Sequence, residues 1–466
     1  MFIFSCLLSI TFSQATPPPL PVFPPLEFHP PKPERFVLEN GLVVFLLEDH
    51  ELPLIKLHAV FRTGSQHEPA DKVGLGAIFG EAMTHGGTLS RKPEDIEKTL
   101  DQKAASVGFG IGLEQGSASM QCRAGDFDEI FSIFVDLTLH PLFRKDFMEL
   151  AKATQLEALR RINDAPGEVS RREFRRILYG ANHPYARLPA PETIKKIGRS
   201  DLIAWHQRFF HPNTTILAIS GDFQSSAMKE KLQKTFGDWP KAEVSLPTVP
   251  EVPATRGKQL FYINRPISQS QIRIGSLGLA RHNPDHFAWE VFNELWGGSA
   301  TSRLFRTVRT QMGLAYSVGS GYSEPALPGL IVAVSQTRNA ETIKAVQAIL
   351  QISKECRAAP FTPGDIQDAK EAIQNRFIEN YTSSEQIVSE VMGFEYFGYP
   401  ADYLDTYPGR IAAVTAADLA RVGEKYLRPE DSTILIMGDL SLFNKPLSTL
   451  GKPQEVKPLD YSQGEP

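Results

Sequence analysis

Hydrophobic and polar positions alternate along the first part of the folded chain and then change to a helical spacing. Residues 54–62 alternate as a β-strand, and residues 73–84 place their apolar side chains on one face of a helix. A Gly-Gly pair at 86–87 ends that helix. The apolar positions that recur at helical spacing are Leu75, Ile78, Phe79, Ala82 and Met83.

The second half of the chain repeats this arrangement. Residues 269–277 predict a strand and residues 286–295 an amphipathic helix, which ends at Gly297-Gly298. Near the end of each half, a proline turn opens a β-branched buried strand that closes at Gly-Asp. The two strands are spaced by 217 residues, which brings these pairs into register: Pro212 and Pro429, Ile219 and Ile436, Gly221 and Gly438, Asp222 and Asp439.

The repeat predicts two homologous domains. Strand and helix blocks differ in length and order, which favours an α+β fold with a mixed sheet packed with helices over a parallel α/β sheet. The expected boundaries follow the repeat and the proline-containing stretch between its halves. We expect a signal peptide at 1–15, a proline-rich spacer at 16–34, domains at 35–240 and 257–446, a linker at 241–256 and a tail at 447–466.

The N-terminus predicts export. Residues 2–12 form an apolar run too short to span a bilayer, and Ser13-Gln14-Ala15 suits signal peptidase cleavage. No Lys or Arg precedes the run, so a truncated start or a buried N-terminal strand remains the alternative. We expect a periplasmic or otherwise exported protein, or a cytoplasmic one if the leader does not function.

Composition excludes several classes of protein. The chain is 42% hydrophobic and 22% charged with a net charge of −5, which rules out wholesale disorder and a strongly basic nucleic-acid binder. The three cysteines, Cys6, Cys122 and Cys356, lack the spacing of a zinc knuckle or iron–sulfur site. Sequence alone leaves a Cys122–Cys356 disulfide undecided.

The first-domain helix carries the chain's most informative motif, Gly-Leu-Gly-Ala-Ile-Phe-Gly-Glu-Ala-Met-Thr-His-Gly-Gly-Thr, at 74–88. It resembles the zinc-binding helix of the pitrilysin/insulinase-type metallopeptidases, the inverzincins. The resemblance extends over nearly the whole chain beyond the leader, through the duplicated halves, His183-Pro184-Tyr185, both Gly-Asp strand ends and Gly-Leu-Ala-Tyr at 313–316. It implies a clamshell of two domains.

The residues that would bind zinc are missing at the positions the resemblance assigns. The first histidine falls on Ala77, the general-base glutamate on Gly80, the second histidine on Glu81 and the third ligand on Ala158. Zinc needs three protein ligands and an open position for water. Glu81 alone does not make such a site, and Gly80 offers nothing to accept a proton. We therefore expect no zinc in this chain.

A displaced site built from Glu81, His85 and Glu157 is the alternative, although His85 is explained equally well as a cation at a helix end. The glycine-rich stretch 108–112 lacks the strand and helix of a phosphate loop and fits a strand better. By family resemblance, an edge strand near 107–113 could add a substrate peptide.

One constellation of the family is retained in the second domain. Arg309 and Tyr316 match the pair that the family places over its zinc from that domain. A guanidinium can hold a peptide carbonyl, and a phenol can donate to the developing oxyanion. Gly297 and Gly298 resemble a glycine-rich loop with which some non-catalytic family subunits contact substrate. The alternatives are a surface ion pair for Arg309 and a core tyrosine for Tyr316.

The resemblance implies a function for this combination. Some family members consist of two chains, one with His-x-x-Glu-His and zinc, the other with only the Arg/Tyr pair. We expect a non-catalytic, substrate-binding subunit of a heterodimeric zinc peptidase, with zinc in the partner and unfolded peptide as substrate. An inactive structural or peptide-binding homologue and an active peptidase with displaced ligands are the alternatives.

Overall fold

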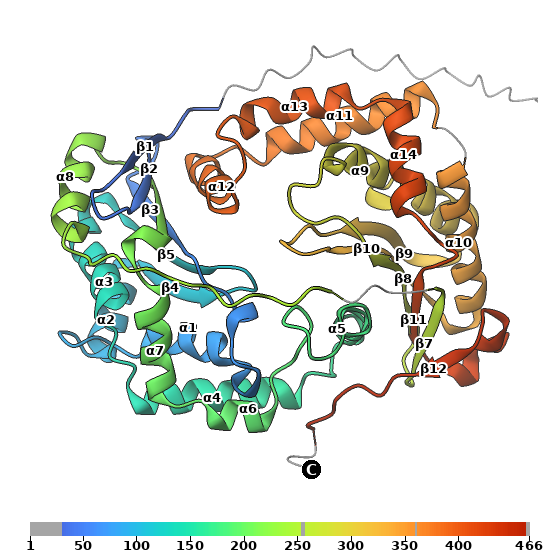
Figure 1. Ribbon diagram of the computed structural model, residues 1–466, viewed down its shortest axis with the longest axis horizontal. Coiled ribbons are helices and arrows are strands. Elements are labelled where there is room, and N and C mark those ends of the chain that lie inside the picture. The colour runs from blue at the N-terminus through green and yellow to red at the C-terminus, as the bar shows by residue number, and fades with distance from the viewer. Residues whose placement is uncertain (1–29, 253–256, 359–360, 463–466) are drawn as a thin grey trace, which may run out of the picture.

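The computed structural model describes residues 30–252, 257–358 and 361–462, and these fold into two halves that each contain a six-stranded sheet. Figure 1 shows the two sheets on opposite sides of the molecule. The expected leader at 1–15 and most of the spacer at 16–34 lie outside the described residues. The α+β fold of two domains expected from the repeat is confirmed.

The first sheet holds a parallel pair of strands beside an antiparallel series. Strands β2 and β6 run parallel, β3 runs antiparallel to β6 and β5, and β4 forms an edge. In spatial order the strands are β1 (Glu34–Val37), β2 (Val43–Glu48), β6 (Thr215–Gly221), β3 (Leu54–Phe61), β5 (Gly116–Arg123) and β4 (Ser106–Ile111).

The second sheet repeats this topology, with β7 parallel to β11 and β9 at the equivalent edge. Its opposite edge differs, because β12 comes from the end of the chain and runs parallel to β7. Strand β12 lies within 447–466, the segment expected to be a tail. In spatial order the strands are β12 (Pro453–Glu455), β7 (Gln259–Asn264), β11 (Thr433–Gly438), β8 (Gln269–Leu277), β10 (Leu330–Arg338) and β9 (Ala315–Tyr322).

Helices surround each sheet, and their apolar faces supply the two large cores. In the first half they are α1 (Leu75–His85), α2 (Pro93–Lys103), α3 (Phe127–Leu139), α4 (Lys145–Arg160), α5 (Pro166–Tyr179), α6 (Pro191–Lys196), α7 (Arg199–Phe209) and α8 (Ser225–Phe236). In the second half they are α9 (His286–Asn293), the π-helical segments η5 (Glu294–Gly298) and η6 (Phe305–Gln311), α10 (Thr342–Ala358), α11 (Pro363–Glu379), α12 (Ser384–Phe397), α13 (Tyr403–Ala413) and α14 (Ala416–Tyr426).

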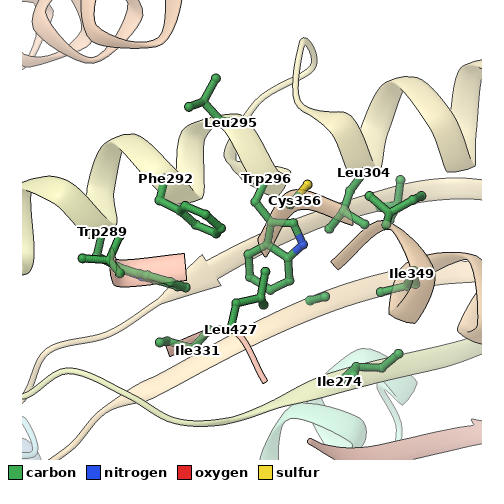
Figure 2. Close-up of a cluster of buried hydrophobic side chains, with 14 of the residues drawn as sticks. Ile274, Trp289, Phe292, Leu295, Trp296, Leu304, Ile331, Ile349, Cys356 and Leu427 are labelled. Atoms are coloured by element: carbon green, nitrogen blue, oxygen red, sulfur yellow. The ribbon is translucent and has the colours of Figure 1, made fainter. Parts of the chain in front are cut away.

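The core of the second half centres on tryptophans from the α9–η5 segment. Trp289 and Trp296 are fully buried, and the Trp296 indole donates to the Ser353 hydroxyl at 3.2 Å. Figure 2 shows Trp296 close to Cys356 and Leu304. Cys356 is a free thiol in this core, and Cys122 is a free thiol in the core of the first half. The structure therefore contains no disulfide between these two cysteines.

The two halves exchange helices across their junction. Helix α5 of the first half packs on β8 and β11 of the second sheet, and α12 of the second half packs on β2 and β6 of the first. Phe174 of α5 is buried with Leu435 and Met437, while Val388 of α12 is buried with Phe45. Each sheet is thus covered on one face by a helix from the opposite half, as Figure 1 shows for α5 and α12.

No helix in the described part of the chain is long and apolar enough to cross a membrane.

Candidate functional site

Helix α1 is held at its start by a buried carboxylate. Glu68 accepts hydrogen bonds from the backbone amides of Gly74 at 3.0 Å and Gly76 at 2.7 Å. Gly74 adopts a positive φ of 106°, which turns the chain into the helix. Burial raises the pKa of the Glu68 carboxyl, although its two backbone hydrogen bonds act in the opposite direction. This anchor fixes where the rest of α1 lies.

The positions that correspond to the zinc ligands and the general base lie on α1 and α4. Ala77 and Glu81 are exposed and one turn apart, and Ala158 is exposed on α4, which packs against α1. Gly80, three residues after Ala77 on the same helix, is buried. Two alanines provide no lone pair for a metal ion, and a single carboxylate at Glu81 does not complete a site.

The alternative cluster of displaced ligands does not assemble in this structure. Nε2 of His85 lies 3.9 Å from Oε2 of Glu81, and both side chains are exposed. Glu157 instead accepts hydrogen bonds from Arg160 at 3.1 Å and Arg161 at 3.0 Å. Among the described residues, no group of three or more His, Cys, Asp or Glu side chains is arranged to hold a metal ion.

Gly80 allows α1 to lie directly against the edge strand β4. A Cβ atom at Gly80 would meet the Phe109 carbonyl oxygen at 3.0 Å. The Phe109 amide donates to the Thr84 hydroxyl at 3.0 Å, and that hydroxyl also donates to the Gly80 carbonyl at 2.9 Å. The backbone of Phe109 is therefore covered by α1, and a peptide cannot pair with the strand at this residue while the helix lies there.

The glycine-rich stretch 108–112 forms most of β4 and the turn after it, as the sequence indicated. A Cβ atom at Gly76 would meet Ile111 of this strand at 2.8 Å. Glycine at these two positions of α1 therefore lets the helix pack closely on the strand.

Gly297 plays the corresponding packing role in the second half. It follows Gly80 by 217 residues, the same spacing that relates Gly221 to Gly438. A Cβ atom at Gly297 would come within 2.7 Å of the Ser320 amide nitrogen on the edge strand β9. Gly297 and Gly298 end η5, a π-helical continuation of α9, and are not in an extended loop. Their contact with substrate stays a prediction.

Arg309 lies on η6, which packs against β9. Its side chain is exposed, and the guanidinium lies 4.7 Å from the centre of the Phe305 ring. Within the described chain Arg309 forms no ion pair or side-chain hydrogen bond. The surface ion pair considered as its alternative role is therefore absent from the described residues.

Tyr316 lies on a β-bulge of the edge strand. Gln336 pairs with Ser317 and Thr337 with Ala315, so that Tyr316 is the extra residue between them. Its side chain is 71% exposed, which excludes a core tyrosine, and its hydroxyl has no hydrogen-bond partner among the residues described. Bulges turn side chains away from the regular pleat and recur beside active sites.

A glycine turn comes directly before this bulge, within the Gly-Leu-Ala-Tyr motif noted in the sequence. Gly313 has a positive φ of 60°, and the Leu314 amide donates to the Val308 carbonyl at 3.0 Å. This turn joins η6 to β9 and places Arg309 and Tyr316 on neighbouring elements. Both polar side chains have donors free to interact with a molecule outside the described chain.

Comparisons with known proteins identify the family. A family model described as Insulinase (Peptidase family M16) matches residues 43–188, and a second, described as Peptidase M16 inactive domain, matches residues 196–373. This chain belongs to peptidase family M16. The resemblance inferred from the helix motif and the duplicated halves is confirmed.

Relatives within the M16 family have low sequence identity to this chain, but the similarity covers most of its length. The chain is 22% identical over 358 residues to "Uncharacterized zinc protease YmxG" of Bacillus subtilis, covering 76% of this chain and 86% of that protein. It is 22% identical over 396 residues to "Non-peptidase homolog YmxG" of Helicobacter pylori, covering 84% and 90%. Because both proteins are only 22% identical to this chain, its activity has to be inferred from its own residues.

Solved structures share the fold. A peptidase M16 inactive domain from Pseudomonas fluorescens gives a TM-score of 0.80 at 22% identity, over 89% of this chain and all of that one. The periplasmic protease PqqL from Escherichia coli gives a TM-score of 0.74 at 15% identity, over 92% of this chain and 49% of PqqL. The M16 fold is therefore present across both halves.

The M16 family implies zinc, and the residues of this chain do not fit it. Its four corresponding positions are alanine, glycine, glutamate and alanine, and the buried one is closed by the Phe109 carbonyl. Neither the ligands nor the proton acceptor of a metallopeptidase are present at these positions. The side chains at these positions therefore do not support zinc-dependent hydrolysis within this chain.

A group of arginines on α5 and the segment after it was not among the residues predicted from the sequence. Arg171, Arg172 and Arg175, together with Arg187, line a cavity of about 400 Å³. The signal was present in the sequence as Arg171-Arg172-Glu-Phe-Arg175-Arg176, whose arginines recur at helical spacing.

Proposed function

We propose that this chain is the non-catalytic, substrate-binding subunit of a two-chain M16 zinc metallopeptidase. Arg309 and Tyr316 would act on a peptide held at the zinc site of the partner subunit. The partner would carry His-x-x-Glu-His, the metal and the general base. The substrate would be an unfolded peptide.

One observation carries this proposal: Tyr316 is exposed on a bulge of the edge strand, its hydroxyl has no partner among the described residues, and positions 77, 81 and 158 hold no set of zinc ligands. A solvent-exposed tyrosine contributes little to folding, so its geometry is better explained by a ligand outside the chain. A phenol placed in this way can donate to an oxyanion, and Arg309 can hold a carbonyl. Loss of one such donor typically costs about 3–4 kcal/mol of transition-state stabilisation.

Export is part of the proposal. The apolar run at 2–12 and the small-residue site at 13–15 favour a cleaved leader, although no basic residue precedes them. A periplasmic protease among the structural neighbours is consistent with this compartment. N-terminal sequencing of the exported protein would begin at Thr16 if cleavage follows Ala15.

The experiment combines this chain with an M16 homologue from the same organism that has an intact His-x-x-Glu-His motif. Purified alone, this chain should bind no stoichiometric zinc and cleave no peptide, while the mixture should cleave a quenched fluorescent peptide. Arg309→Ala and Tyr316→Phe should each lower kcat of the mixture about 100-fold or more, without changing zinc content. Arg428→Ala, an exposed arginine elsewhere, serves as the control.

Two outcomes would point to the other functions. Unchanged turnover with both variants would remove the role of Arg309 and Tyr316 and favour a structural or peptide-binding homologue. The covered backbone of Phe109 favours the structural form of this second function, because it blocks addition of a peptide strand there. One zinc per isolated chain, with hydrolysis to match, would instead favour an active peptidase with displaced ligands.

A further inference from the structure

A cavity of about 400 Å³ in the first half is lined by four arginines and one glutamate. Helix α5 contributes Arg171, Arg172 and Arg175, and the segment after it contributes Arg187. The glutamate is Glu168, which pairs with Arg171 at the exposed rim. A concave wall with an excess of one charge focuses potential and raises the local concentration of ions of opposite sign.

Two of these arginines form no ion pair with a carboxylate of the described residues. Arg175 donates to the Tyr185 carbonyl oxygen at 2.5 Å, and Arg187 donates to the carbonyl oxygens of Ser65 at 3.1 Å and Glu68 at 2.6 Å. Carbonyl groups orient a guanidinium but do not cancel its positive charge. The Glu68 carboxylate offsets part of the charge of Arg187 without forming an ion pair with it. The Arg175 guanidinium makes no other hydrogen bond with the described residues, so most of its N–H donors are unused.

Neighbouring residues keep the cavity positive. Arg172 donates to Glu173, which also accepts from Arg176, so this buried carboxylate is shared between two arginines. Behind α5, Arg273 of β8 donates to the Ser170 hydroxyl at 3.1 Å and the Gly167 carbonyl at 3.3 Å. Arg273 also has no carboxylate partner in the described structure, and it adds to the positive potential.

The pKa values of these arginines reflect their burial. Burial lowers the pKa of Arg175 and of Arg187, and it lowers the pKa of Arg273 to about 10. The Glu68 carboxylate acts on the Arg187 pKa in the opposite direction, and the Glu168 carboxylate acts in this way on the Arg273 pKa, but burial outweighs both. At Arg175 the positive charge of the neighbouring Arg171 lowers the pKa further.

The cavity lies next to the end of edge strand β4. Its lining includes Leu113, in the turn after β4, and Ser65, whose amide donates to the Gly112 carbonyl at 2.8 Å. Tyr185, also in the lining, donates to the Glu114 carboxylate of the same turn at 2.9 Å. Since α1 covers Phe109 of the strand itself, the cavity is the better place in this half to accept a peptide side chain.

We propose that this arginine cavity binds a carboxylate group of a peptide, so that the chain selects substrates with an acidic segment. The inference deepens the proposed function by naming the class of peptide. Guanidinium groups hold carboxylates with paired, charge-assisted hydrogen bonds, and Arg175 and the rim residue Arg171 are placed to provide them.

The test measures binding to this chain alone, at low ionic strength, with three fluorescent peptides of one sequence. They carry three adjacent Glu, Gln or Lys residues. The native chain should bind the Glu peptide at least 10-fold more tightly than the Gln peptide, with a difference that shrinks as salt is added. Arg171→Glu and Arg175→Gln should each reduce the difference to less than twofold. Arg428→Glu, which changes the net charge as Arg171→Glu does, should preserve it.

Equal binding of the Glu and Gln peptides by the native chain would overturn the proposal, as would discrimination that survives both arginine variants. Inorganic phosphate is the second probe. Phosphate that competes with the Glu peptide supports a shared site, whereas Arg175-dependent phosphate binding without peptide discrimination would mean a free-anion site and overturn the proposal. Arg171 is exposed, so its variant tests the cavity even if Arg175→Gln fails to fold. Because no partner is present, these outcomes are independent of the role of Arg309 and Tyr316.

Discussion

The amide of Phe109 on the edge strand β4 donates to the hydroxyl of Thr84 on helix α1, at 3.0 Å. This bond joins the helix that would carry zinc to the strand beside it, and Gly80 lies at the same contact. Loss of the general-base side chain at this position therefore accompanies close packing of the helix. At position 80 the first half therefore has a helix–strand contact where the resemblance assigns a general base.

Gly80→Ala should destabilise the protein, although alanine favours helices by about 0.5–1 kcal/mol over glycine. The added methyl group would meet the Phe109 carbonyl at 3.0 Å, and such overpacking costs about 1–3 kcal/mol. Gly393→Ala is the matched control, because Gly393 lies inside α12 with no atom near its Cβ position. Urea unfolding should show Gly393→Ala more stable than Gly80→Ala by about 1–3 kcal/mol; equal values would mean that α1 does not pack tightly on β4.

Tyr316→Phe should leave stability within about 0.5 kcal/mol of the native protein, because the exposed hydroxyl has no partner in the described chain. Tyr407→Phe is the contrasting variant, since the buried Tyr407 hydroxyl donates to the Glu290 carboxylate. Its removal should cost about 1–3 kcal/mol. Comparison of thermal unfolding tests this contrast, and a large loss for Tyr316→Phe would assign that hydroxyl a structural role.

Much of the fold could be predicted from the sequence, because the repeat relates distant segments. Residues 269–277 form β8 with the expected bounds, and residues 54–62 form β3 apart from the last residue. The exchange of α5 and α12 between halves could not be predicted, since an amphipathic pattern identifies an apolar face but not the sheet that it covers. Strand β12 could not be predicted either, because three residues paired at a sheet edge carry little hydrophobic pattern.

Part of the candidate site could also be predicted from the sequence, and part of it required the structure. The absence of zinc ligands at 77 and 158 and of a general base at 80 can be read from residue types alone, whereas the close contact at Gly80 requires the position of β4. The sequence suggested Tyr316 by its motif, but exposure on a bulge depends on pairing with β10. The arginine cavity depends on α5 meeting the segment that contains Tyr185 and Arg187, which are distant from its first turn.

Asp285 should make stability depend on pH in the acid range. Burial raises the pKa of its carboxyl, but hydrogen bonds from Lys425, Arg421 and Tyr426 outweigh burial and bring the pKa to about 2, from an ordinary 3.8. Because the folded-state pKa is lower than the unfolded one, the stabilisation is present above pH 3.8 and is lost as pH falls toward 2. The difference corresponds to about 2 kcal/mol.

Urea unfolding between pH 5 and pH 2 measures this effect. Asp285→Asn should be less stable by about 2 kcal/mol at pH 5 and should lose part of the decline toward pH 2. Asp368→Asn, an exposed carboxylate with no ion pair in the described chain, should retain the full decline. Identical pH profiles for Asp285→Asn and the native protein would show that the Asp285 pKa is not depressed.

Phe174→Ala should weaken the connection between the halves. Phe174 lies on α5 but is buried among residues of the second sheet, including Leu435 and Met437. Its truncation should cost about 3–5 kcal/mol and separate the unfolding of the two halves into two transitions. Phe134→Ala, within the core of the first half, should have a similar cost without removing a contact between halves. Calorimetry distinguishes them: a single transition for Phe174→Ala with unchanged midpoint would contradict the exchanged-helix arrangement.

A zinc site should be recoverable without changing Gly80. Ala77 and Glu81 are exposed one turn apart on α1, and α4, which carries exposed Ala158, packs against that helix. Histidines four residues apart on one helical face can bind the same metal ion. The triple variant Ala77→His, Glu81→His, Ala158→Glu should therefore bind one zinc ion per chain, measured by mass spectrometry after dialysis. Without a general base at position 80 it should still cleave no peptide.

The control for this variant moves only the carboxylate. Ala77→His, Glu81→His, Ala153→Glu places the glutamate at another exposed position of α4, five residues earlier and on a different helical face. It should bind zinc at least 10-fold more weakly than the variant with Glu at 158, because the histidines then lack the third ligand. Adding Gly80→Glu to the first variant should lower its thermal stability, since that side chain meets the Phe109 carbonyl. Equal zinc affinity of the two triple variants would show that Ala158 does not lie opposite the histidine positions, and a stable quadruple variant with peptidase activity would show that α1 can move away from β4.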